Sequence, residues 1–157
     1  MSSETFHADD SFHVGRLQNL GFVIWFETPT LNRVKLVAQT LPRLEQQPNT
    51  GFAMMAVVTP ACAPVGADIR AEFDDAMRAH REAALGMAAV IEVTGVLGGL
   101  TRAIARTLSV VNRSPYPLTT FTSVADAAAW LPDIMTQRGA PSIESQRIID
   151  EIAAHYR

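Results

Sequence analysis

The chain has 157 residues, of which 48% are hydrophobic and 18% charged, and its formal net charge is −3. This mix of apolar and charged residues excludes disorder, and a chain of this length can bury roughly 70% of its unfolded surface in one domain. The slight acidity argues against nonspecific nucleic-acid binding, and a single cysteine, Cys62, excludes an internal disulfide and a thiolate metal cluster. We therefore expect one cytoplasmic domain.

The first fifty residues predict a tail, two strands and a divided helix. Residues 1–11 are polar and mildly acidic, unlike a signal peptide, and are expected to form a flexible tail. Residues 12–17 predict a short strand, and residues 21–26 form an apolar run typical of a strand covered on both faces. Thr30 is placed to cap a helix that Pro42 should divide. The predicted buried side of this helix contains Leu31, Val34, Leu41 and Leu44.

The remainder of the chain alternates apolar runs with amphipathic segments. Asp68 and Ser123 are placed to cap two of the predicted helices. The longest apolar stretch, residues 86–100, is interrupted by Glu92, and a bilayer span needs about 20 mostly apolar residues, so no membrane span is expected. Further strands are predicted over residues 51–58, 86–94 and 118–122. Further helices are predicted over residues 69–83, 100–112, 124–131 and 143–156.

Strands that alternate with helices of ten or more residues imply an α/β fold with a largely parallel sheet. We expect a single domain with a mixed, mostly parallel sheet of about five strands, layered with helices. The first strand is expected at an antiparallel edge, and the C-terminal helix is expected as an addition to this core.

Ligands of open α/β sheets bind beyond the carboxyl ends of the parallel strands, so polar residues at that edge are candidates. Glu92 stands out because it interrupts an apolar strand, where a carboxylate is costly unless it is paired. One interpretation is the polar floor of a small pocket; the other is a strand-end residue that reaches water or a cation. The candidate pocket residues are Phe26, Met55, Glu92 and Thr94.

Other patterns at this edge lack the spacing that catalysis requires. The glycines of residues 94–99 do not match a phosphate-binding loop and lack its lysine. Cys62 follows a strand, where a thiol can be activated, although a lone cysteine is more often inert core filling. The four histidines show no metal-ligand spacing, so neither a metal nor a cofactor is expected. Arg102 and Arg106 lie one turn apart on an outward helix stripe, which is either a solvated face or a surface for an anionic partner.

The segment FTSVADAAAWL, residues 121–131, resembles the closing segment of bacterial STAS-like domains, the family related to anti-anti-sigma factors. Residues 100–108 and 21–27 also resemble this family, and the likeness covers residues 12–132. It implies a STAS-like core, with residues 133–157 as a linker and an appended helix. Regulatory members carry a phosphoacceptor after an aspartate in the loop that follows the middle strand. Here Thr59 is the only hydroxyl of that stretch and no aspartate precedes it, so a kinase-controlled switch is not implied.

Three functions remain open at this point, and no catalytic set points to an enzyme. The first is a noncatalytic, regulatory protein-interaction module, with an unidentified protein partner. The second is a small-ligand or lipid-binding sensor that uses the candidate pocket. The third is a homo-oligomer formed through Ile149, Ile152 and Tyr156 of the C-terminal helix. The interaction surface expected for the first comprises Thr59, Cys62, Asp68, Arg102 and Arg106.

Overall fold

The computed structural model describes residues 3–46, 50–92, 95, 99, 102–103 and 115–156. Its strands form one six-stranded sheet in which neighbours follow sequence order. The pairs β1–β2 and β2–β3 are antiparallel, and the three pairs from β3 to β6 are parallel. The predicted mixed, mostly parallel α/β sheet is therefore confirmed. The strands are β1 (Ser3–Ala8), β2 (Phe12–Leu17), β3 (Leu20–Trp25), β4 (Phe52–Val58), β5 (Ala84–Ile91) and β6 (Leu118–Phe121).

The sixth strand comes from the segment that the sequence analysis treated as a flexible tail, and that prediction is wrong. β1 pairs with β2 across a hairpin, with Thr5 opposite Gly15. Glu4 binds both Arg16 of β2 and Arg43, and the Arg43 guanidinium lies 4.1 Å from the centroid of the Phe6 ring. Polar side chains therefore stabilise this strand through partners that are distant in sequence. The strand has only a weak hydrophobic pattern of its own, and the sequence did not predict it for this reason.

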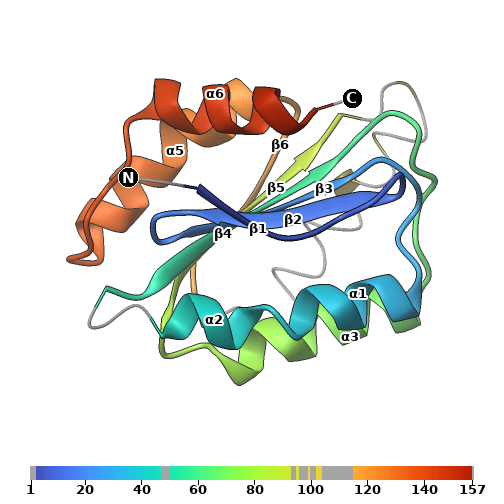
Figure 1. Ribbon diagram of the computed structural model, residues 1–157, viewed down its shortest axis with the longest axis horizontal. Helices are drawn as coiled ribbons and strands as arrows, with labels where there is room; N and C mark the ends of the chain where they lie inside the picture. The colour runs from blue at the N-terminus through green and yellow to red at the C-terminus, as the bar shows by residue number, and fades with distance from the viewer. Residues whose placement is uncertain are drawn as a thin grey trace.

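Helices cover both faces of the sheet, as Figure 1 shows. Three helices between β3 and β5 lie on one face, and two helices that follow β6 lie on the other. Most of the helix predicted over residues 100–112 is outside the described residues. The first group is α1 (Leu31–Ala38), α2 (Leu41–Glu45) and α3 (Ala67–Ala79), and the second is α5 (Val124–Gln137) and α6 (Ser145–His155).

The α1–α2 segment confirms two expectations and corrects a third. The Thr30 hydroxyl accepts a hydrogen bond from Arg33 N, as an N-cap does, and the helix divides just before Pro42. Val34, Leu41 and Leu44 are buried, but Leu31, the first residue of α1, is 36% exposed. At Gly21 of β3, a Cβ atom would stand 2.5 Å from a Leu44 methyl group, so this glycine allows α2 to approach the sheet closely.

The boundaries of α3 and α5 differ in part from the prediction. Gly66 is the N-cap of α3, without a side-chain cap, and Asp68 lies in the first turn instead; α3 ends at Ala79, before a turn. The Ser123 cap of α5 is confirmed by its hydrogen bond from Asp126 N. α5 continues through Pro132 to Gln137, past the predicted end, because burial of residues such as Met135 offsets the loss of one helical hydrogen bond.

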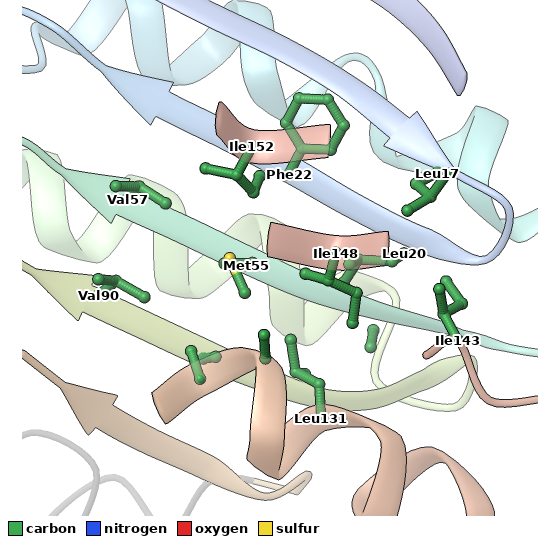
Figure 2. Close-up of a cluster of buried hydrophobic side chains, with 14 of the residues drawn as sticks. Leu17, Leu20, Phe22, Met55, Val57, Val90, Leu131, Ile143, Ile148 and Ile152 are labelled. Atoms are coloured by element: carbon green, nitrogen blue, oxygen red, sulfur yellow. The ribbon is translucent and has the colours of Figure 1, made fainter. Parts of the chain in front are cut away.

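The predicted C-terminal helix is present, and it packs against the sheet. Ile148 is fully buried and Ile152 is 2% exposed, and both lie over the sheet beside Phe22 and Met55 (Figure 2). Ile149 packs against the same cluster. The apolar face that the oligomer hypothesis assigned to another copy is therefore occupied by this chain's own sheet.

Candidate functional site

The candidate site lies at the carboxyl edge of β3, β4 and β5. Pairing continues just beyond these strands, since Thr59 N donates to Trp25 O over 3.3 Å and Glu92 N donates to Val58 O over 2.9 Å. Phe26, Thr59 and Glu92 therefore lie at the same edge, as expected for residues that follow parallel strands. The fold brings together residues separated by more than sixty positions in the sequence.

The loop of residues 59–66, which we call the anchored loop, is attached to this edge by hydrogen bonds. The Thr59 hydroxyl donates to Trp25 O over 2.7 Å, and the Cys62 thiol donates to the same carbonyl over 3.3 Å. Ala63 N donates to the Thr28 hydroxyl oxygen over 2.8 Å, and Arg70 donates to Val65 O. These contacts tie the loop to the end of β3 and to the start of α3, so its backbone is ordered before any partner arrives.

Two of the predicted surface residues do not lie on the surface. Thr59 is 5% exposed and Cys62 is 4% exposed, because their side chains turn inward to the Trp25 carbonyl. The exposed part of the loop consists instead of small residues that the sequence analysis did not select. These are Pro60, Ala61, Ala63, Pro64 and Gly66.

The same environment keeps Cys62 in its thiol form. Burial raises the pKa of Cys62 above its ordinary value, and the hydrogen bonds from Thr59 oppose this effect only in part. A thiolate is the reactive form of cysteine, so a raised pKa makes Cys62 a weak nucleophile. Its position favours the structural interpretation of this residue.

The remaining residues of the predicted surface are placed differently. Asp68 is exposed in the first turn of α3, next to the anchored loop. Arg102 is half-buried and its guanidinium donates to Ile91 O over 3.2 Å, at the end of β5. Arg102 is therefore held at the sheet edge and does not extend freely into solvent. Arg106 lies outside the described residues.

The predicted pocket residues are only partly brought together. Phe26 and Glu92 both contact Tyr156, which follows α6: the Tyr156 hydroxyl donates to Glu92 Oε1 over 2.9 Å, and the Phe26 ring meets the Tyr156 ring edge-on at 6.5 Å. Met55 is fully buried within the packed core, and Thr94 lies outside the described residues. Glu92 thus has a hydrogen-bond donor at the strand end, which supports the structural interpretation of this carboxylate.

Tyr156 is the residue of this edge that the sequence analysis missed, because it assigned Tyr156 to contacts between chains. Partial burial and then the hydrogen bond to Glu92 raise the pKa of Tyr156 to about 12. The neutral phenol is thus the form that the folded protein favours. The only sequence signal was a polar aromatic residue at the end of an amphipathic helix, which does not reveal its partner.

Among the described residues, no group of three or more His, Cys, Asp or Glu side chains is arranged to bind a metal ion. Each histidine of the described chain has its own local contact: His7 with Asp9, His80 with Glu45, and His13 with His155. Within the same described ranges, no helix has the length and apolarity needed to cross a membrane. The arrangement therefore offers an ordered surface and hydrogen-bonded polar side chains.

We compared the chain with models of protein families, with curated proteins and with solved structures, and none of the three comparisons found a match.

Proposed function

We propose that this protein is a noncatalytic regulatory module that binds another protein through the anchored loop and the adjoining start of α3. The observation that carries this proposal is the loop's combination of exposure, apolarity and order. No charged residue lies between Thr59 and Ala67, and most of these residues are exposed. Exposed apolar surface of this kind is typical of contacts between proteins.

The order of the loop favours binding. A loop that is mobile before binding loses conformational entropy when its partner fixes it, and this loss weakens affinity. Here the hydrogen bonds to Trp25 O and from Ala63 N have already fixed the backbone. The small side chains of the loop allow a partner to approach the backbone closely.

Strand order also supports a surface rather than a deep ligand site. Ligand crevices of doubly wound sheets form where the strand order reverses and helices leave opposite faces. In this sheet the strands follow one another from β1 to β6, and the helices α1 to α3 lie on one face (Figure 1). The resemblance of residues 12–132 to STAS-like domains implies the same kind of regulatory interaction.

The test replaces two exposed alanines of the loop. In the Ala61→Arg/Ala63→Arg variant, two bulky charges stand where the proposal places an apolar contact. The matched control, Ala125→Arg/Ala129→Arg, introduces the same charges at exposed positions of α5, on the other face of the sheet. Quantitative affinity capture from the source cell identifies proteins retained by the wild type, and titration with each purified protein gives its Kd.

A partner that binds the wild type and the control with equal Kd, and the loop variant at least tenfold more weakly, supports the proposal. If every captured partner binds the loop variant as tightly as the wild type, the proposed surface is wrong. Circular dichroism and urea unfolding of both variants show whether the substitutions leave the fold intact.

A second candidate function is the small-ligand or lipid-binding sensor, supported by the corner that Phe26, Glu92 and Tyr156 form at the same edge. An apolar ring beside a hydrogen-bonded carboxylate offers both kinds of contact that a small ligand uses. Native mass spectrometry of freshly purified protein tests this function. A co-purified ligand that is lost in Glu92→Gln favours the sensor, and the mass of the bare chain contradicts it.

A further inference from the structure

The anchored loop continues into a side of α3 that bears three carboxylates. Asp68, Glu72 and Asp75 are spaced four and three positions apart, which places them on one side of the helix. Asp68 and Asp75 are exposed and Glu72 is half-buried, and we call this side the acidic face. At a rise of about 1.5 Å per residue, the acidic face is about 10 Å long. It begins two positions after the end of the apolar loop, so the two form one continuous surface.

The two arginines of α3 do not neutralise the acidic face. Arg70 lies on the opposite side of the helix and donates to Val65 O. Arg78 donates to Asp74 Oδ2 over 2.8 Å, and Asp75 interacts with Arg78 less strongly than Asp74 does. Within the described ranges, none of the three carboxylates of the acidic face forms a hydrogen bond or an ion pair. The folded chain therefore leaves most of this negative charge uncompensated.

A further carboxylate lies on the other side of the anchored loop. The Glu27 side chain is 56% exposed and binds Arg33 over 3.2 Å, and its neighbour Thr28 accepts the hydrogen bond from Ala63 of the loop. Burial is the main cause of the raised pKa of Cys62, and the charge of Glu27 adds to it, so this charge lies close to the loop. Since α1 and α3 pack side by side, the apolar loop lies between carboxylates from two parts of the chain (Figure 1).

We propose that the partner of the anchored loop, whose existence rests on the proposed function, presents a basic segment of protein. An apolar side chain of this segment lies against the loop, and its arginine or lysine side chains lie along the acidic face. Like charges three or four positions apart on a helix repel each other, and the cations of a partner relieve this repulsion. The same carboxylates repel phosphate groups, so the surface disfavours nucleic acids and anionic membranes.

The length of the acidic face also sets the spacing of the partner's charges. About 10 Å corresponds to two turns of an α-helix, so a helical segment that lies along α3 needs basic residues spread over two turns. An apolar residue about one turn beyond the cation that meets Asp68 then reaches the loop. The partner's pattern is thus an apolar residue followed by basic residues at helical spacing.

Selection from a phage-displayed library of random peptides tests this chemistry on the full chain. Peptides of about 16 residues span about 24 Å as a helix, enough to cover both the loop and the acidic face. Peptides are selected on the wild type, and those that also bind Ala61→Gln/Ala63→Gln are removed. Glutamine is bulky and polar but uncharged, so this variant disrupts the loop contact and leaves the local charge as it is. We expect the remaining, loop-dependent peptides to be enriched about threefold in Arg and Lys over Asp and Glu, relative to the starting library.

Titration then assigns the basic residues to the acidic face. Loop-dependent peptides are synthesised, and their Kd is measured for the wild type and for Asp68→Asn/Asp75→Asn. The matched control is Asp126→Asn/Asp133→Asn, which removes two exposed carboxylates at the same spacing from α5, on the other face of the sheet. We expect Asp68→Asn/Asp75→Asn to bind about fivefold more weakly than the wild type at low salt, and about equally well near 1 M salt, where charges are screened. The control should bind as the wild type does at both salt concentrations.

The outcomes separate this inference from the proposed function. A basic excess, together with weaker binding by Asp68→Asn/Asp75→Asn at low salt, supports the inference. Loop-dependent peptides without a basic excess, or with a Kd that this variant leaves unchanged, contradict the basic partner but leave the proposed loop surface standing. If every selected peptide binds Ala61→Gln/Ala63→Gln as tightly as the wild type, the proposed surface is wrong and the inference falls with it. The composition of the selected peptides requires no substitution in α3, so it tests the inference even if an α3 variant is unstable.

Discussion

The Tyr156 hydroxyl donates a hydrogen bond to Glu92 Oε1 over 2.9 Å and so closes the end of the chain onto the end of β5. This bond explains how a carboxylate at the end of an apolar strand is stabilised. It also places an aromatic ring against Phe26 at the edge where the sequence predicted a pocket. Substitutions of Tyr156 and of Glu92 test what this contact contributes to stability.

Tyr156→Phe removes only the hydroxyl. We expect a loss of at most about 1 kcal/mol in the free energy of unfolding, because the hydrogen bond joins partly exposed groups. Glu92→Gln keeps an acceptor oxygen and should cost less. Urea unfolding at neutral pH measures both changes. A Tyr156→Phe variant as stable as the wild type would show that water replaces this bond without cost.

The same tyrosine makes stability depend on alkaline pH. The pKa of Tyr156 is raised to about 12 in the folded protein, above its value of 10.0 in the unfolded chain. The unfolded state therefore ionises first, and the contribution of Tyr156 is present below pH 10 and is lost as the pH rises towards 12. We expect the stability difference between wild type and Tyr156→Phe to shrink over this window. A constant difference up to pH 12 contradicts the assignment.

Asp9 should stabilise the β1–β2 hairpin. Its Oδ1 accepts hydrogen bonds from Ser11 N, the Ser11 hydroxyl and Phe12 N, at 2.7, 2.5 and 3.1 Å. These bonds, with that of the Ser11 hydroxyl foremost, hold the pKa of Asp9 well below its usual range. The stabilisation is present above about pH 4 and is lost as the pH falls further.

Asp9→Ala removes the oxygen that accepts these three hydrogen bonds. Because Asp9 is exposed at the surface, we expect a destabilisation of about 1 kcal/mol at pH 7, which becomes smaller at pH 3. Urea unfolding at both pH values measures the difference, and Asp10→Ala, one position further along the same turn, serves as a comparison. An equal effect of Asp9→Ala at both pH values would mean that its charge does not matter.

Gly15 controls how closely β1 approaches β2. A Cβ atom at this position would stand 2.5 Å from the Glu4 carbonyl oxygen, and a backbone atom cannot move aside as a flexible side chain can. We expect Gly15→Ala to cost about 1 to 3 kcal/mol and to raise the hydrogen exchange of β1. Gly99→Ala, where no atom lies within 4 Å of the new Cβ, is the matched control and should leave β1 unchanged. Full protection of β1 in Gly15→Ala would contradict the strand pairing.

Cys62 should react slowly with thiol reagents in the native protein. Its side chain is 4% exposed, and burial raises the pKa of the thiol. We expect modification by a soluble disulfide reagent at pH 8 to be more than tenfold slower in the native state than in urea. Thr28→Val, which removes the acceptor for Ala63 N, should accelerate the native reaction by loosening the anchored loop. Equal native and denatured rates would place Cys62 at the surface.

The hydrophobic pattern of the sequence was sufficient for much of the fold. Continuous apolar runs such as residues 52–58 predicted strands covered on both faces, and Thr30 and Ser123 marked two helix starts through their hydroxyl caps. These features are local, because a strand in a covered sheet must be apolar throughout and an N-cap acts on its own first turn. The α/β class with a mostly parallel sheet followed from them.

Contacts between distant residues decided the rest. β1 depends on the ion pairs that Glu4 forms with Arg16 and Arg43. The position of α6 depends on the contacts of its C-terminal end with His13 and Glu92. No local pattern could predict either. Contacts of this kind also explain why Thr59 and Cys62 lie in the interior and not on the predicted surface. Each donates a hydrogen bond to the Trp25 carbonyl, more than thirty positions earlier in the chain. A sequence by itself determines which segments can be buried, whereas only the folded chain determines which polar groups meet, because hydrogen bonds require positions in space that the order of residues does not contain.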